Sequence, residues 1–165
     1  MRNLRLIGER RRLFTELEVE LSSAIVDVCE VHGSIGSDGE QRAFLKEDGC
    51  VVLIQDDILW NSKLSDICNS GSSGWFDLTF VDPVLVALSR RGAIVSVLDD
   101  GEAELVGEFE NGIAAACWSP DKEILALITS AEDDEDPSKT KSVLLTMTAK
   151  WDILAEVTIE RIADD

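Results

Sequence analysis

The sequence predicts an all-β protein made of repeated four-stranded antiparallel sheets, and three observations carry this prediction. First, residues 112–160 contain four strand-length apolar runs with no helix-length segment between them. Second, turns with glycine or proline separate the runs, and no crossover helix fits between them, which excludes a parallel sheet. Third, first strands that start near Ile25, Trp75 and Ile113 recur at intervals of about 40 to 50 residues, the length of a β-propeller blade.

Composition and charge narrow the classes of function. Apolar residues make up 45% of the 165 residues, which is typical of a globular chain with a real core. Fifteen basic and 33 acidic side chains give a formal charge of −18. Such a surface repels phosphate backbones and anionic lipids, so the composition argues against direct nucleic-acid binding by this segment. Keeping the domain soluble is the more common role of an acidic surface.

The first third of the chain predicts an entry strand and one blade. Met1–Ile7 alternates apolar and polar residues and predicts a strand. Leu17, Val19 and Leu21 alternate with glutamates, a pattern that favours a strand, with a helix as the competing interpretation because Glu and Leu are good helix formers. The expected strands of the first blade are Ile25–Val31, Arg42–Lys46, Cys50–Gln55 and Ile58–Ile67, with a hairpin turn at Asp48-Gly49 and a connector at Asn69–Gly74.

Two clearer units follow. The second predicts strands at Trp75–Val81, Val84–Ser89, Ala93–Leu98 and Glu104–Phe109, and the third at Ile113–Trp118, Ile124–Thr129, Val143–Met147 and Ile153–Ile159. Val84–Leu88 and Ile124–Ile128 are apolar on both faces, so we expect both runs to be covered from both sides, as the inner strands of stacked blades are. Ile153–Ile159 alternates in its second half and is expected to be an outer, half-solvated strand.

The domain organisation follows from these units. Blades are expected at roughly 22–68, 75–110 and 112–160, so residues 1–165 as a whole are interpreted as the N-terminal part of a WD40-like β-propeller. About three blades make an incomplete ring, because seven blades of about 40 residues need roughly 280. An open ring would expose apolar blade faces and a bare sheet edge.

The cysteines, the single histidine and the glycine-rich segment do not have the spacing of a metal, catalytic or nucleotide-binding site. Cys29, Cys50, Cys68 and Cys117 lack the close pairs of a zinc site, and His32 is the only histidine. Since three of the four cysteines lie in apolar runs, we expect reduced thiols that behave as small buried hydrophobes, in a cytosolic or nuclear compartment. The glycines at 33, 36 and 39 fit neither a Walker loop nor a dinucleotide fingerprint, and His32 beside them is expected to be an ordinary loop residue.

Three further features have a plainer and a functional interpretation. Trp118 and Trp151 could stack a ligand, but they are better explained as packing plugs between blades. The run 132–136 lacks the spacing of a calcium loop and predicts a mobile, solvated hairpin insertion. The basic run 10–12 is interpreted as solvated surface. No catalytic, cofactor-binding or metal-binding residue is predicted, and no apolar run is long enough to span a membrane, so we expect a soluble intracellular chain.

Several segments together resemble a known family. They are Met-Arg-Asn-Leu-Arg-Leu at residues 1–6, Asp-Pro-Val-Leu-Val-Ala at 82–87, Gly112–Glu123 with its Trp-Ser-Pro-Asp, and Leu-Leu-Thr-Met-Thr at 144–148 followed by Trp151. Their order and spacing resemble the N-terminal WD40-like propeller of the Elongator complex protein 1 (IKAP) family, over nearly the whole chain.

The resemblance implies a non-catalytic scaffold without a cofactor. Its partners would be the other subunits of the Elongator complex, which modifies the wobble uridine of certain tRNAs, and tRNA would be contacted only indirectly through the complex. Homodimerisation, if any, would use regions absent here, and the location would be cytoplasmic or also nuclear. Two alternatives stay open: a WD40-like protein-interaction adaptor unrelated to Elongator, and a propeller enzyme, which is the weakest because no acid–base pair or nucleophile motif is present.

Overall fold

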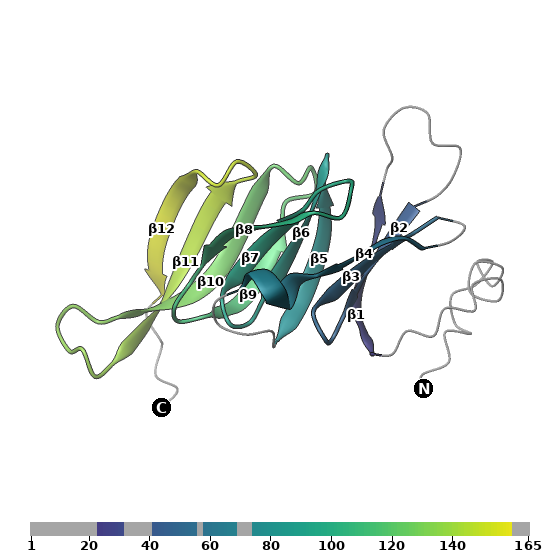
Figure 1. Cartoon of the computed structure of the whole chain (residues 1–165). Coiled ribbons are helices and arrows are strands. Elements are labelled where there is room, and N and C mark those ends of the chain that lie inside the picture. The colour runs from purple at the N-terminus through teal and green to yellow at the C-terminus, as the bar shows by residue number, and fades with distance from the viewer. Residues whose placement is uncertain (1–22, 32–40, 56–57, 69–73, 160–165) are drawn as a thin grey trace.

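Three four-stranded antiparallel sheets follow one another along the chain, which confirms the predicted all-β class and the predicted number of blades. The computed structural model describes residues 23–31, 41–55, 58–68 and 74–159. In Figure 1 the sheets stand side by side in chain order, from purple to yellow, in an open stack. Their strands are β1 (Ile25–Val31), β2 (Gln41–Lys46), β3 (Cys50–Ile54) and β4 (Ile58–Lys63), then β5 (Trp75–Val81), β6 (Val84–Ser89), β7 (Ala93–Val97) and β8 (Ala103–Glu108), then β9 (Ile113–Trp118), β10 (Ile124–Glu132), β11 (Thr140–Thr148) and β12 (Ile153–Ile159).

Every sheet is a simple meander in which consecutive strands pair. The turns between strands have the residues that such turns need. At the β2–β3 turn, Gly49 adopts a φ of 83°, and the amide of Cys50 donates a hydrogen bond of 3.0 Å to Oδ1 of Asp48. The same arrangement recurs at the β7–β8 turn, where the amide of Glu102 donates to Asp100. The hairpin predicted at Asp48-Gly49 is therefore confirmed.

The middle sheet is covered on both faces, as predicted for Val84–Leu88. Leu85 and Ala87 of β6 belong to the core shared with the first sheet, whereas Val86 and Leu88 belong to the core shared with the third. Successive side chains of a strand point to opposite faces, so a strand with alternate residues in two cores must be apolar at every position. This is the reason for the unbroken apolar run.

Polar contacts also join adjacent sheets. The Nε1 of Trp60 on β4 donates a hydrogen bond of 2.9 Å to the carbonyl of Asp99 at the β7–β8 turn. The guanidinium of Arg90, next to β6, donates to the carbonyl of Ala114 on β9 and lies 4.4 Å from the centre of the Phe76 ring. Each sheet is thus tied to the next by a side chain as well as by its apolar face.

The three sheets repeat one irregularity. The pairing of the first and second strands shifts by one residue after the pairs Ile25–Lys46, Trp75–Ser89 and Ile113–Thr129. The next paired positions are therefore equivalent in the three sheets. On the second strands they are Leu45, Leu88 and Ile128, and on the first strands Asp27, Asp77 and Ala115.

The structure corrects three details of the sequence interpretation. The strand expected at Ile58–Ile67 ends at Lys63, and Leu64–Ile67 forms a 3-10 helix (η3). The run Ile124–Ile128 is fully buried on one face only: the second sheet packs on Leu125 and Leu127, whereas Ile124 is 41% exposed and Ile128 is partly exposed. Strand β12 is exposed along its whole length rather than half-solvated. It is the outermost strand of the third sheet, and the apolar core lies beneath β10 and β11.

The features predicted at Met1–Ile7, at the basic run 10–12, at Leu17–Leu21 and at the loop around His32 lie outside the described residues. Within the described ranges, no helix has the length and the apolar character that crossing a membrane requires.

Candidate functional surfaces

The β10–β11 hairpin is the longest in the described part of the chain and carries the densest charge. Both strands have nine residues, and their pairing runs from Ile124–Thr148 to Glu132–Thr140. We call residues 132–141 the acidic hairpin. They include five consecutive acidic residues at 132–136 and lysines at 139 and 141. The predicted hairpin is confirmed, although its strands extend further than the apolar runs indicated.

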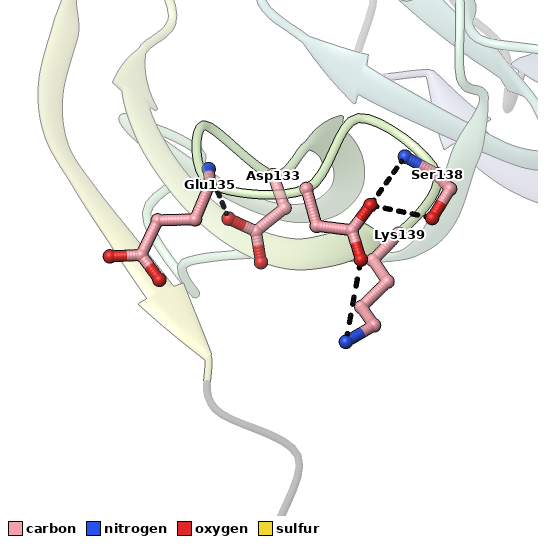
Figure 2. Close-up of polar contacts among 5 residues, drawn as sticks. Asp133, Glu135, Ser138 and Lys139 are labelled. Carbon is pink, nitrogen blue, oxygen red and sulfur yellow. Dashed lines mark hydrogen bonds and ion pairs between the residues drawn. The ribbon is translucent and has the colours of Figure 1, made fainter.

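Short-range hydrogen bonds shape the tip of the acidic hairpin. The amide of Glu135 donates to Oδ1 of Asp133 at 3.0 Å, and the amide and hydroxyl of Ser138 donate to Oδ1 of Asp136 at 3.1 and 2.6 Å. Figure 2 shows that the side chains of Glu135 and Lys139 extend outward from the hairpin. The carboxylates therefore bond to their own loop and still face solvent.

The lysines neutralise only part of this charge. The Nζ of Lys139 lies 3.5 Å from Asp136, and that of Lys141 lies 3.1 Å from Asp134. Hydrogen bonds from Ser138 hold the pKa of Asp136 below its ordinary value, and the hydrogen bond to Asp134 raises the pKa of Lys141. Five acidic residues against two lysines leave the acidic hairpin with an excess of negative formal charge, so it is an anionic surface suited to contact with a basic protein surface.

Trp118 and Trp151 pack together at one end of the third sheet. Their ring centroids are 6.3 Å apart with planes at 72°, an edge-to-face contact. Trp118 is 9% exposed and belongs to the core between the second and third sheets, and Trp151 packs against that core. The predicted role of these rings as packing plugs is confirmed. Among the described residues, the buried Nε1 of Trp118 has no hydrogen-bond partner.

Two carboxylates, on the first strands of the first and second sheets, were not predicted from the sequence. The amide of Leu78 on β5 donates a hydrogen bond of 2.9 Å to Oδ2 of Asp27 on β1, which joins the first two sheets. Asp77 occupies the equivalent bulge position of the second sheet and accepts a hydrogen bond of 3.0 Å from the hydroxyl of Thr79. Burial, and then the charge of Asp27, raise the pKa of Asp77. The repeated bulge is the signal for these positions, and it depends on a register that a sequence does not show.

The cysteines are free thiols with different surroundings. Burial, together with the charges of Asp27 and Asp77, raises the pKa of Cys29 to about 12, so this thiol stays protonated and unreactive. Cys117, however, is exposed. Its expected burial was wrong, because it pairs with Ala126 on the face of the third sheet that lies away from the second sheet. Within the described residues, no group of three or more His, Cys, Asp or Glu side chains could hold a metal ion.

The stacked four-stranded meanders define an open β-propeller segment of the WD40-like class. The family model for the first N-terminal β-propeller of ELP1 matches residues 1–165, and the chain belongs to this family. The mouse Elongator complex protein 1 is 30% identical over 122 residues, which make up 73% of this chain and 7% of the relative. The fission yeast protein of the same name (Schizosaccharomyces pombe) is 27% identical over 84 residues, or 47% of this chain and 6% of the relative. The chain therefore spans only a small part of these relatives.

Solved structures agree on the fold. Sqt1 of Saccharomyces cerevisiae superposes with a TM-score of 0.56 at 11% identity, over 82% of this chain and 38% of that one. BBS1N, solved in complex with ARL6DN, superposes with a TM-score of 0.50 at 12% identity, over 87% of this chain and 41% of that one. Identities this low show a shared architecture and nothing about partners.

Proposed function

We propose that this chain is a non-catalytic scaffold segment of the Elongator complex that supports modification of tRNA wobble uridines. The observation that carries the proposal is the match of the ELP1 first-propeller family over residues 1–165. Membership of the ELP1 family supports other Elongator subunits as the partners, and it supports a cytoplasmic location with the nucleus as a further one.

The described surfaces support a binding role. The acidic hairpin offers carboxylates that face solvent. Exposed charge of one sign is a feature by which proteins recognise partners of the opposite charge. The formal charge of −18 disfavours contact with a phosphate backbone, so tRNA is reached through other subunits.

The test uses the full-length protein that contains this segment, in cells that lack their own copy. We expect the tagged protein to recover the other Elongator subunits, and deletion of the gene to lower the fraction of wobble uridine that carries carboxymethyl-type modification, measured by mass spectrometry of digested tRNA. Recovery of a different assembly, together with unchanged uridine modification, would contradict the proposal and favour an unrelated adaptor.

A finer comparison asks whether the acidic hairpin is a contact. In one variant Asp133→Asn, Asp134→Asn and Glu135→Gln remove three charges from the tip, and in the control Glu102→Gln and Glu104→Gln remove charges from exposed positions at the β7–β8 edge. We expect the hairpin variant to recover less of the partner subunits at raised salt and the control to behave as wild type. Equal recovery from both variants excludes the hairpin as a contact and leaves the scaffold role to other surfaces.

A further inference from the structure

Strand β12 is exposed even on the side that faces the second sheet. On that side it carries Ile153, Glu156 and Thr158, which pair with Met147, Leu145 and Val143 of β11. Paired residues of neighbouring strands share a face, and the three partners on β11 lie in the core between the second and third sheets. Ile153 is nevertheless 62% exposed, and Glu156 and Thr158 are exposed as well. The second sheet therefore covers β11 and stops short of β12.

Strand β8, the outermost strand of the second sheet, leaves space on its side too. Gly107 pairs with Ile94, which belongs to the same core, and a Cβ added to Gly107 would meet no atom within 4 Å. Glu104 pairs with Ser96, two residues from Ile94 and hence on the same face, and it is exposed. Between β8 and β12 there is thus an opening, which we call the outer groove. It is lined by Glu104, Gly107, Ile153, Glu156 and Thr158.

The equivalent space between the first and second sheets is filled by the chain itself. The hairpins of these two sheets have the same register, so Trp60 of β4 is equivalent to Glu104, and Ser62 is equivalent to Gly107. Trp60 packs against the core of the first two sheets and donates its hydrogen bond to Asp99, and Ser62 is only 7% exposed. The outer groove is therefore not a necessary result of stacking sheets, because the chain closes the same space one sheet earlier.

The outer groove combines an apolar side chain with carboxylates. Ile153 lies on one wall, and Glu104 and Glu156 lie on opposite walls. Among the described residues, neither carboxylate has an ion pair, and the amino group of Lys141, which feels the charge of Glu156, lies 3.1 Å from Asp134. A complementary ligand has apolar and cationic groups together, and a phosphate backbone or an anionic lipid is repelled.

The spacing of the sheets selects an extended chain. Packed sheets lie about 10 Å apart, whereas a helix with its side chains is about 10–12 Å wide, so a helix does not fit between β8 and β12 without moving them. An extended chain is narrower and projects side chains to both walls. Glycine inside a strand often marks a place where another backbone approaches closely, and Gly107 offers such a place.

We propose that the outer groove binds an extended peptide segment of a partner protein. An apolar side chain of the segment packs beside Ile153 and Gly107, as Trp60 packs in the equivalent space, and lysine or arginine side chains of the segment lie toward Glu104 and Glu156. A contact of this size belongs to the weak class, with a dissociation constant on the order of 10–100 μM. The inference goes beyond the proposed Elongator role, because it adds a partner to the subunits of that complex.

Fluorescence anisotropy of a labelled peptide tests the proposal on the full-length protein that contains this segment. The probe is a peptide of about eight residues in which lysine and leucine alternate, and the comparison peptide has serine in place of each leucine. Charge attracts both peptides equally, so we expect the leucine peptide to bind about tenfold more tightly through its apolar side chains. Equal affinities would mean that only the acidic charge attracts the probe, and they would overturn the proposal.

A matched pair of variants locates the binding site. Ile153→Ser should raise the dissociation constant of the leucine peptide about tenfold. The control is Ile58→Ser, because Ile58 has the equivalent position before the bulge of β4 and is also exposed, at 41%. This control should change the constant by no more than about twofold. Gly107→Leu fills the groove from the other wall and should weaken binding at least as much as Ile153→Ser. Equal effects of Ile153→Ser and Ile58→Ser would overturn the proposal.

A labelling experiment tests whether the outer groove is accessible in the full-length protein. In an Ile153→Cys variant, a maleimide should modify position 153 rapidly, as located by mass spectrometry of the digested protein, and the leucine peptide at saturating concentration should slow the reaction about tenfold. Slow modification without the peptide would mean that another part of the protein covers the groove, and a rate that the peptide does not change would mean that it binds elsewhere. Either result overturns the proposal.

Discussion

Gly92 illustrates how a single residue fixes the turn between β6 and β7. Its φ is 105°, its amide donates to the carbonyl of Ser89 at 2.9 Å, and its carbonyl accepts from the amide of Phe109 at 3.0 Å. A Cβ at this position would lie 2.0 Å from the carbonyl oxygen of Phe109. The turn therefore needs both a left-handed backbone and the absence of a side chain.

Gly92→Ala should accordingly destabilise the chain strongly. Backbone strain at a positive φ costs about 1–3 kcal/mol, and the clash with Phe109 adds to it, so we expect a loss of roughly 3 kcal/mol or more in the free energy of unfolding. Urea denaturation measures this loss. The control is Gly107→Ala on β8, where the added Cβ meets no atom within 4 Å and the change should stay within about 1 kcal/mol. Similar losses for the two variants would contradict the role given to Gly92.

Asp77 gives a pH-dependent prediction. Burial and the nearby Asp27 raise its pKa in the folded chain, so folding penalises its charged form. The penalty is present above the folded-state pKa and disappears as the pH falls below the ordinary value of 3.8, where the carboxyl is protonated in both states. Asp77→Asn removes the charge and keeps an acceptor for the Thr79 hydroxyl. It should raise the urea midpoint at pH 8, and the gain should shrink as the pH is lowered.

The exposed Glu123→Gln is the control for this pH series, since it removes one charge from the turn between β9 and β10. Its midpoint should differ from that of wild type by a nearly constant small amount. A gain from Asp77→Asn that grows toward acid pH would show that the charged carboxyl stabilises the fold and would reverse the sign argued here.

Asp48-Gly49 and Asp27 show which structural features a short stretch of sequence can predict and which it cannot. Asp48-Gly49 predicts its turn because an Asx hydrogen bond and a positive φ depend on two adjacent residues. The Asp27 carboxylate bonds to Leu78, 51 residues away, through a bulge that resets which side chains face the neighbouring sheet. Nothing local specifies that register, so the paired carboxylates were missed.

At the scale of the element, neighbouring sheets bury the equivalent middle strands β6 and β10 to different extents. β6 lies between two cores, whereas β10 lies against one, although both runs are apolar on both faces. The apolar pattern correctly predicts that both are middle strands of their sheets. It does not show whether a neighbour is present on each side, because that depends on residues elsewhere.

This difference predicts unequal losses at equivalent positions. Leu88→Ala removes a fully buried side chain between two sheets and should cost about 2–5 kcal/mol. Ile128→Ala removes a partly exposed side chain from the face of the third sheet that lies away from the second sheet, and it should cost less than about 1.5 kcal/mol. Urea denaturation at low protein concentration compares the two. A loss at Ile128 as large as that at Leu88 would contradict the unequal burial of the two side chains.

The acidic hairpin shows a different limit of sequence reasoning. Apolar runs predicted that its strands end at Thr129 and begin at Val143, but pairing continues through Ser130–Ser142 and Ala131–Lys141 to Glu132–Thr140. Backbone hydrogen bonds extend a ladder once its register is set, whatever the polarity of the side chains. Polar strand ends beyond an apolar run are therefore hard to predict. The predicted mobility of the loop stays a prediction.

At the scale of the whole molecule, the stack of sheets follows from the repeat. The spacing of first strands and the doubly apolar middle strand predicted three sheets packed face to face, and the open stack confirms this. The repeat does not show what covers the outer face of the third sheet, since apolar residues give the same sequence pattern whether or not another sheet packs on them. The acidic surface is the other property of the whole chain, and it affects stability directly.

The excess of 18 acidic charges should make the fold more stable in salt than in dilute buffer. Like charges repel more strongly in the compact state, and raising NaCl from about 0.01 to 1 M shortens the Debye length from about 30 to 3 Å. We expect the free energy of unfolding to rise on the order of 1–3 kcal/mol over this range, because the repulsion is spread over many weak pairs. The measurement is urea denaturation at low protein concentration. The hairpin variant with Asp133→Asn, Asp134→Asn and Glu135→Gln carries three fewer charges and should respond less steeply. A flat or falling response would mean that local pairs such as Lys141–Asp134 outweigh the net repulsion.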